Sequence, residues 1–343
     1  MRQAVSALAL SVLLASCSPG GEYEKTFMLM GTVVRVEARA TGDPESAVDA
    51  AAAAMEKTAA AFNIFEKGSE ISRLNSEPGK ERVRVSPKFF DLFMKAKSLY
   101  AVTGGALDVT AEPLLEAWGI YGKETALAPD DAEIKSAMEC VGMNLVSCDA
   151  YTGELVFAKP CVKFDMNAIV PGYAVDAAAD VLKQSGITSA IIDGGGEIRC
   201  IGKKGRAPWR VGIRDPERKN SLFAVMNLED SSVSTSGAYE NFVVIDGRHY
   251  GHVIDPRAGA PAQNDILSAT AMAPSCAAAD GLSTAFLLLS PEESLKIADS
   301  FPGIECVIIE KGGQIPNVYL SSGVRGLKLM RGANVIKRSG DER

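Results

Sequence analysis

The chain has 343 residues, of which 47% are hydrophobic and 23% are charged, so it is a globular protein long enough for one large domain or two ordinary ones. Its net charge of −7 argues against nucleic acid as a partner, because nucleic-acid-binding domains carry a basic surface. Only two histidines are present, His249 and His252, which argues against a zinc site with several histidine ligands.

The first residues have the pattern of a bacterial export signal. Arg2 precedes an apolar run over residues 4–15, which is too short to span a bilayer. The run closes with the sequence LASC, which ends at Cys17 and resembles the lipobox of bacterial lipoproteins. We therefore expect a lipid on Cys17 to anchor the protein to the membrane, facing the periplasm or the exterior. An ordinary signal peptide with an incidental cysteine is the alternative.

The expected organisation is a signal peptide over residues 1–16, a tether over residues 17–25 and one domain over residues 26–343. No later stretch is long and apolar enough to be a transmembrane helix. Alternation predicts a strand over Phe27–Ala38, and the alanine-rich stretch Ala47–Phe62 predicts a helix.

Further helices and strands follow from periodicity, caps and turn residues. The expected helices are Pro87–Tyr100, Asp130–Val141, Gly172–Gly186, one from the N-cap Ser275 to Leu289, and one that begins at Pro291. The expected strands are a hairpin of Leu145–Ser147 and Leu155–Ala158 around Tyr151-Thr152-Gly153, then Ala190–Asp193, Trp209–Ile213, Phe223–Leu228 and Phe242–Ile245. Many strands without βαβ alternation indicate an α+β fold of antiparallel sheets covered by helices.

Six cysteines remain after Cys17, and none of them forms a C-x-x-C pair. An even number in an exported chain permits disulfides, and Cys148 and Cys161 could lie opposite one another across the hairpin. Scattered, buried free cysteines are the alternative.

Asp280 and Thr284 stand four residues apart on the helix that begins at Ser275, so their oxygens share one face. A carboxylate and a hydroxyl together suit a hard cation such as Mg2+. A solvated helix face is the more common reason for such a pair, although the apolar residues around it argue against full solvation.

His252 precedes a short apolar strand that ends in Asp255-Pro256 and a glycine-containing turn. A histidine with a near-neutral pKa suits proton transfer. A histidine that is hydrogen-bonded within the turn is the alternative.

Three other segments could contact a nucleotide. The glycines before Asp108 would let a nucleotide approach the backbone, and the hydroxyls of Ser232–Ser236 could donate to an anion unless they form an ordinary serine-rich turn. Phe164–Asp176 is expected to be a strand that breaks at Pro171-Gly172 into a helix, whose N-terminus would favour phosphates.

These segments, in their order and spacing, resemble the ApbE family of FAD:protein FMN transferases over nearly the whole mature chain. The motifs are MGT (Met30–Thr32), SEISRLN (Ser69–Asn75), GALDVT..PL..AWG (Gly105–Gly119), FD..AI..GYAVD (Phe164–Asp176), STSGAY (Ser234–Tyr239), HVIDP..G (His252–Gly259) and AD..STA (Ala279–Ala285). The resemblance implies an α+β fold related to the T-fold, FAD as the donor, Mg2+ as the cofactor and AMP as the leaving product. It also implies a threonine acceptor on exported flavoprotein subunits, such as those of the sodium-pumping quinone reductase and Rnf complexes.

The resemblance also assigns site residues. The metal would be held by Asp280, Thr284 and the backbone carbonyl of Ala168, and His252 would be the catalytic histidine beside the pyrophosphate. FAD would contact Met30, Ala106, Leu107, Asp108, Asp165 and the backbone at Ile254.

Two positions depart from the family pattern and leave alternatives open. Pro171 stands where many relatives carry Lys and others Glu, and proline offers FAD neither a charge nor an N–H. Phe65 stands where some members have a flavin-side Tyr; it keeps the stacking face and favours transfer by excluding water. A Mg2+-dependent FAD pyrophosphatase that releases FMN and AMP is the alternative function, and a flavin-binding lipoprotein without catalysis is another.

Overall fold

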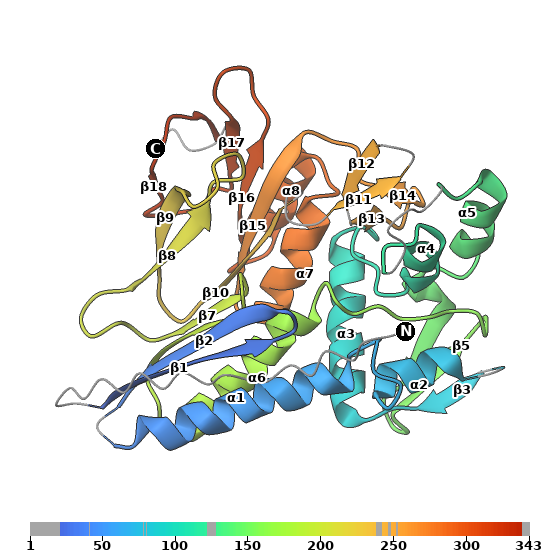
Figure 1. The fold of residues 1–343 in the computed structure, drawn as a ribbon, viewed down its shortest axis with the longest axis horizontal. Coiled ribbons are helices and arrows are strands. Elements are labelled where there is room, and N and C mark those ends of the chain that lie inside the picture. The colour runs from blue at the N-terminus through green and yellow to red at the C-terminus, as the bar shows by residue number, and fades with distance from the viewer. Residues whose placement is uncertain are drawn as a thin grey trace, which may run out of the picture.

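The computed structural model describes residues 21–337, apart from residues 41, 78, 80, 122–127, 238–241, 246–247 and 252. One large sheet crosses the molecule, and its neighbouring strands are antiparallel except for the last pair, which is parallel (Figure 1). In spatial order its strands are β1 (Glu22–Leu29), β2 (Thr32–Arg39), β6 (Ser189–Asp193), β7 (Ile198–Ile201), β10 (Ser232–Gly237), β15 (Ile266–Ala273), β16 (Glu305–Glu310), β17 (Asn317–Leu320) and β19 (Asn334–Lys337). The expected α+β fold of antiparallel sheets covered by helices is confirmed.

Four small sheets accompany the large one. They are β3 (Arg82–Arg84) with β5 (Glu154–Phe157) and β4 (Val146–Asp149); β18 (Lys328–Leu329) with β9 (Leu222–Leu228) and β8 (Trp209–Arg214); β11 (Phe242–Ile245) with β12 (Arg248–Gly251); and β13 (Ile254–Asp255) with β14 (Ala260–Pro261). The helices are α1 (Pro44–Ala61), α2 (Glu70–Ser76), α3 (Pro87–Val102), α4 (Glu112–Ala117), α5 (Asp131–Met138), α6 (Val170–Gln184), α7 (Cys276–Phe286), α8 (Pro291–Ser300) and a 3-10 turn, η1 (Met143–Leu145). None of the helices in the described ranges is long and apolar enough to span a membrane.

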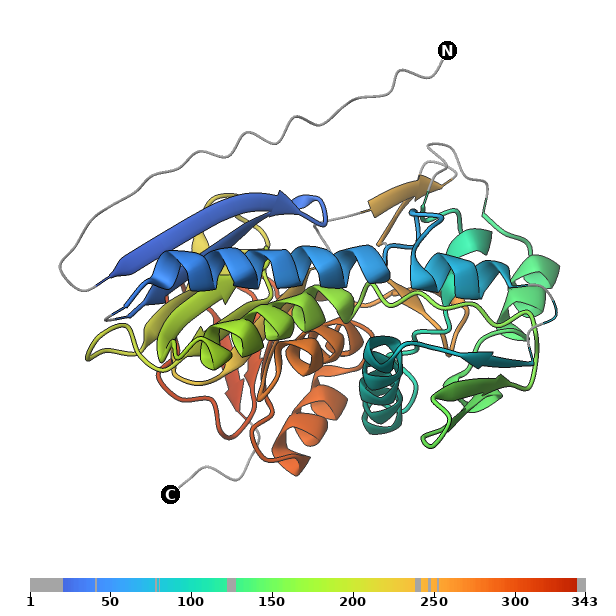
Figure 2. The ribbon, with the colours of Figure 1, turned by 90° about the horizontal axis from the view of Figure 1, so that it is seen from below.

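The two faces of the large sheet are covered differently. α1 and α6 run side by side over the face at β2 and β6, where Val36, Met55 and Val175 belong to one buried cluster (Figure 2). α7 and α8 pack on β15 and β16 through a cluster that contains Ile308. The neighbouring Ile309 points to the opposite face, because side chains alternate along a strand, and belongs to the cluster beneath β8 and β9.

Most of the expected helices and strands are confirmed within a few residues. Ser275 caps α7 by accepting a hydrogen bond from the Ala278 N–H, although the helix ends at Phe286 rather than Leu289. The strand expected over Phe27–Ala38 is wrong, because the chain reverses there between β1 and β2. Met30 and Gly31 both have positive φ angles, 50° and 76°, as a two-residue hairpin turn requires, and such a turn leaves the alternation undisturbed.

Two further expectations are wrong, and one helix was not expected. Residues 164–169 form no strand; they run through the core as an irregular segment and a turn, and α6 begins at Val170. The hydroxyl-rich Ser232–Gly237 is not a turn but the buried strand β10. α2 has no counterpart among the expected elements, because its short polar sequence shows no clear period.

The cysteine pairing also differs from the expectation. Cys161 forms its disulfide with Cys140, at a Cα–Cα distance of 5.5 Å, and not with Cys148. Cys148 lies in β4 opposite Leu155, whereas Cys161 follows β5, where the chain passes the end of α5. The four other cysteines in the described ranges, including Cys148, are free.

Candidate functional site

A cavity of about 240 Å3 lies where α6, α7, β10, β13 and the loop before α4 meet. Its lining includes eight of the residues expected at the site: Ala106, Leu107, Asp108, Asp165, Ala168, Ile254, Asp280 and Thr284. Four segments that are far apart in sequence therefore contribute to one site, as the resemblance implies. The roles of these residues stay predictions.

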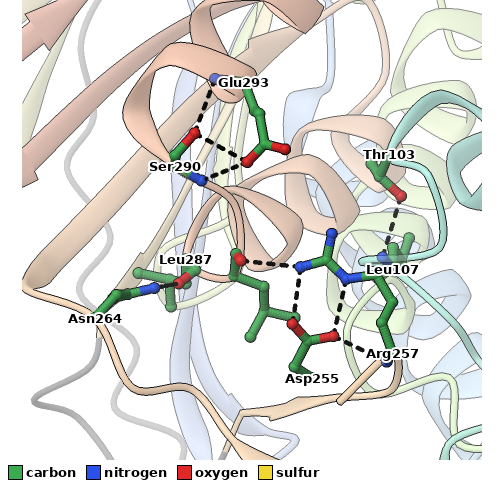
Figure 3. A network of polar contacts seen from close by, with 9 residues as sticks. Thr103, Leu107, Asp255, Arg257, Asn264, Leu287, Ser290 and Glu293 are labelled. Carbon is green, nitrogen blue, oxygen red and sulfur yellow. Dashed lines mark hydrogen bonds and ion pairs between the residues drawn. The ribbon is translucent and has the colours of Figure 1, made fainter.

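The loop that carries Ala106, Leu107 and Asp108 is held by its own hydrogen bonds. The N–H of Leu107 donates to the Thr103 hydroxyl over 3.1 Å, which ties the loop to the end of α3 (Figure 3). Asp108 accepts hydrogen bonds from the N–H and the hydroxyl of Thr110, at 2.8 Å and 2.5 Å. Burial raises the pKa of the Asp108 carboxyl group, and these hydrogen bonds offset part of that rise. Asp108 therefore fixes the shape of the loop.

Asp280 and Thr284 both project from α7 toward the cavity, as their spacing predicts. Asp280 accepts a hydrogen bond of 2.8 Å from the N–H of Gly172, in the first turn of α6. The two helices approach closely there, since a Cβ on Gly172 would lie 2.4 Å from the carbonyl oxygen of Cys276. A reciprocal contact also joins the two helices, because Asp176 of α6 accepts hydrogen bonds from the N–H groups of Cys276 and Ala277 in α7.

The cavity concentrates negative charge. Asp280 is only 5% exposed, and Glu197, which follows three glycines after β6, lines the same cavity. Burial and the nearby Glu197 raise the pKa of Asp280 well above its usual value. The described lining contains no Lys, Arg or His that could balance this charge. The site therefore favours a bound cation.

The available donors are those that a hard cation prefers. The cavity offers the carboxylates of Asp280 and Glu197, the Thr284 hydroxyl and the Ala168 carbonyl. Ser236 of β10 lies 3.3 Å from the Thr284 hydroxyl and 2.8 Å from the Ser283 hydroxyl, so α7 is also joined to the large sheet. No group of three or more His, Cys, Asp or Glu side chains that could hold a metal occurs in the described ranges. A cation would thus depend on one or two carboxylates, neutral oxygens and water, as Mg2+ does in many sites.

Asp165 belongs to a second polar group in the lining. The Tyr121 hydroxyl donates to Asp165 over 2.6 Å, and the Asn167 N–H donates to the other carboxylate oxygen over 2.7 Å. Burial raises the pKa of Asp165, and these hydrogen bonds lower it in part. Phe65 packs edge-on against Tyr121 at a centroid distance of 5.3 Å, but it is 67% exposed and lies outside the cavity lining.

The turn that follows Ile254 is clamped onto the end of α7. Arg257 forms an ion pair of 2.8 Å with Asp255 and also donates to the Leu288 carbonyl over 3.1 Å (Figure 3). Asn264 donates to the neighbouring Leu287 carbonyl over 2.7 Å. The expected catalytic residue His252 lies outside the described residues, but Val253 and Ile254, which follow it, line the cavity.

One of the expected residues that the structure describes is placed differently from the others. Met30 does not line the cavity; it is 36% exposed in the β1–β2 turn. This turn nevertheless approaches the site, since a Cβ on Gly195 would lie 2.4 Å from the Thr32 hydroxyl. Pro171 lines the cavity from the first turn of α6.

Glu197, Tyr121 and Asn167 line the cavity but were not identified as site residues from the sequence. The available signal for Glu197 was an acidic residue after Gly194–Gly196 at a strand end, where the backbone turns sharply. Tyr121 and Asn167 carry no such signal, because their position depends on the hydrogen bonds to Asp165.

The chain is similar to known proteins over most of its length. The model of the ApbE family matches residues 30–308. An FAD:protein FMN transferase of Vibrio cholerae is 31% identical over 308 residues, which are 88% of this chain and 91% of that protein. One of Treponema pallidum is 30% identical over 308 residues, 84% of each chain.

Solved structures agree with the sequence relatives. The crystal structure of the ApbE protein of Thermotoga maritima superposes with a TM-score of 0.79 at 31% identity, covering 88% of this chain and 97% of that one. The flavin transferase ApbE of Vibrio cholerae also gives a TM-score of 0.79, at 28% identity, covering 89% of this chain and 98% of that one.

Proposed function

Because the chain belongs to the ApbE family, we propose that it is an enzyme that transfers FMN from FAD to a hydroxyl group of an acceptor protein. The observation that carries this proposal is the acidic cavity around Asp280, which a nucleotide pyrophosphate could enter only together with a cation. In the reaction, the acceptor oxygen forms a bond to the phosphorus of the FMN half. The bond from that phosphorus to the bridging oxygen breaks, and AMP leaves.

Mg2+ is the cation that fits the donor set. Asp280, Thr284 and the Ala168 carbonyl would hold it, with Glu197 as a second carboxylate at the cavity. When bound, Mg2+ supplies positive charge that neutralises the pyrophosphate and the departing phosphate. The protein's own contribution is to position the reacting groups, which accounts for most of the catalysis in phosphoryl transfer.

We propose that His252 accepts the proton that the acceptor hydroxyl loses. Two residues further on, Ile254 lies in the cavity lining and in β13, which leads into the turn that Arg257 holds at the end of α7. The segment that follows position 252 is therefore held at the site.

We propose that FAD contacts Ala106–Asp108, Asp165 and the Ile254 backbone in the cavity, and Met30 at the adjoining turn. Pro171 can offer neither charge nor N–H, so FAD depends on these other contacts and on the cation. We further propose that the acceptor is a threonine of an exported flavoprotein subunit, of the quinone-reductase or Rnf type, and that a lipid on Cys17 keeps the enzyme at the same membrane.

Replacement of Asp280 tests the function and the metal together. Asp280→Asn keeps the size of the side chain and an oxygen that can accept from Gly172, but it removes the charge that a cation needs. We expect transfer, measured as covalent FMN on the acceptor by intact-protein mass spectrometry, to fall at least about 100-fold. The wild type should also gain thermal stability on addition of Mg2+ without FAD, and the variant should not.

Asp131→Ala, which removes an exposed helical carboxylate, is the matched control and should keep both properties. Full transfer by Asp280→Asn at limiting Mg2+ would refute the metal assignment. If the wild type converts FAD mainly to free FMN and AMP at saturating acceptor, the protein is instead an FAD pyrophosphatase. That outcome would also refute the expectation that Phe65 favours transfer.

A further inference from the structure

A second cavity adjoins the reaction cavity. It has a volume of about 110 Å3, and Glu197 and Thr235 line both cavities. Its remaining walls come from the turn between β6 and β7, from β8 and from Val233 of β10. β8 can be followed in Figure 1, where it runs beside β9. The second cavity therefore borders the place where the pyrophosphate would react.

The β8 wall is the edge of a strand. Four consecutive residues, Val211, Gly212, Ile213 and Arg214, line the cavity, although successive side chains of a strand point to opposite faces. The cavity must therefore run along the backbone of β8. β8 is the last strand of the sheet β18–β9–β8, and within the described ranges residues 209–213 make backbone hydrogen bonds only to β9. An edge of this kind can pair with an additional strand.

The wall that comes from the turn between β6 and β7 includes two glycines, Gly195 and Gly196. Gly196 has a φ angle of 141°, and a Cβ there would find no atom closer than 4.0 Å. Asp193 accepts the N–H groups of Gly195 and Gly196, at 2.9 Å and 3.2 Å, so the turn is held in place. Walls without side chains on a fixed turn allow another backbone to approach closely.

A folded acceptor domain cannot enter a cavity of about 240 Å3, so only an extended segment can bring its hydroxyl to the reacting phosphorus. We propose that this segment of the acceptor protein binds as an extra strand along β8, and that its threonine enters the reaction cavity past Glu197 and Thr235. This inference rests on the proposed function.

Amide hydrogen exchange on the wild-type protein tests the inference. The probe is a purified Rnf-type acceptor subunit whose flavin-bearing threonine is replaced by valine, so that it binds without reacting. With FAD and Mg2+ present, we expect this probe to slow exchange in the peptide that covers residues 209–214 at least about 5-fold, since newly paired amides are protected. FAD and Mg2+ alone should leave that peptide unchanged.

Steady-state kinetics give a second readout. Gly212→Val adds a branched side chain to a residue that lines the cavity, and the atoms nearest to the new Cβ belong to the half-exposed Leu222 side chain, the first at 2.7 Å. We expect the KM for the acceptor to rise at least about 10-fold, with a smaller change in kcat. Gly332→Val, at a position with no atom within 4 Å of a new Cβ, is the control and should keep the wild-type KM.

The outcomes separate this inference from the proposed function. Covalent transfer without protection of residues 209–214, or with protection elsewhere on the surface, would overturn strand addition at β8 and leave the function standing. Protection of these residues by a second copy of the enzyme, without acceptor, would also overturn it. Absence of covalent FMN in the wild type, despite FAD binding, would refute the proposed function itself.

Discussion

Glu112 is a buried carboxyl group close to the candidate site. It is 8% exposed, and its Oε2 atom is buried without a hydrogen-bond partner. Burial, then the negative charges of Asp165 and Glu116, raise its pKa to about 8, while Lys163 acts in the opposite direction. Glu112 is therefore uncharged at neutral pH, so it does not add a second buried negative charge beside Asp165.

This environment makes stability depend on pH. Between the unfolded pKa of about 4.5 and the folded pKa of about 8, the folded protein binds more protons than the unfolded chain, so Glu112 makes the free energy of unfolding fall as pH rises. Glu112→Gln removes this contribution. We expect the variant to gain stability relative to the wild type between pH 5 and pH 8, by at most about 1.4 kcal/mol per pH unit.

Denaturant unfolding of both proteins at pH 5, 6.5 and 8 measures this difference. Glu77→Gln is the control, because Glu77 is exposed and is not among the charges that act on Glu112. If the stabilities of wild type and Glu112→Gln run parallel across this range, the Glu112 carboxyl group is not held neutral.

At the scale of residues, site residues could be predicted from the sequence where they lie on one regular element. They could be predicted less well where a tertiary contact determines their position. Asp280 and Thr284 were identified by their spacing, because a helix fixes which residues share a face. Glu197 was missed, since its position beside Asp280 depends on the packing of β6 and β7 against α6 and α7. The charge of Glu112 was equally unpredictable, because burial decides it.

At the scale of elements, the pairing of α6 with α7 organises the site. Each helix donates N–H groups to a carboxylate of the other, through Asp280 and Asp176. Both contacts require the close approach that Gly172 permits. The pair therefore sets the distance between the expected metal ligands and the N-terminus of α6.

Gly172→Ala tests this role. Its Cβ would lie 2.4 Å from the Cys276 carbonyl oxygen and 2.8 Å from the Asp280 Cβ, so the helices must separate. We expect a loss of about 1–3 kcal/mol in the free energy of unfolding, as for other overpacked cores, and a lower apparent affinity for Mg2+. Denaturant unfolding and a Mg2+ titration of thermal stability measure the two effects. Gly42→Ala, where a Cβ meets no atom within 4 Å, should change neither, and a Gly172→Ala protein with wild-type values would show that the approach is dispensable.

Elements were predictable where local pattern and tertiary environment agree. The amphipathic α3 and the capped α7 were found within a few residues. The β1–β2 hairpin was mistaken for one strand, because a two-residue turn preserves the alternation of side chains. β10 was mistaken for a turn, because its hydroxyl groups are satisfied by contacts such as Ser236 with Ser283, which sequence cannot show.

At the scale of the whole molecule, the position of β1 relates the site to the proposed membrane anchor. Four residues lie between Cys17 and Glu22, the first residue of β1, and the five steps along the chain span at most about 18 Å when extended. β1 then runs eight residues, about 27 Å, to the turn that approaches Gly195. A lipid on Cys17 would therefore hold the reaction cavity within a few tens of ångströms of the bilayer, near membrane-bound acceptors.

Cys17→Ser tests this arrangement in cells. One lipid-bearing cysteine is the proposed link to the membrane, and no described helix could replace it, so we expect the variant to leave the membrane fraction. Detergent-phase partitioning followed by immunoblotting measures this shift, and mass spectrometry of the wild-type N-terminus should show a lipid on Cys17. Cys148→Ser, which removes a free and partly exposed cysteine, is the matched control and should stay with the membrane. The released variant should transfer FMN to a soluble acceptor domain at the wild-type rate but flavinylate a membrane-bound acceptor in cells more slowly, because anchoring raises the effective concentration of the two proteins. A mature wild-type chain that begins after Cys17, or a Cys17→Ser protein that remains in the membrane fraction, would contradict the lipid anchor.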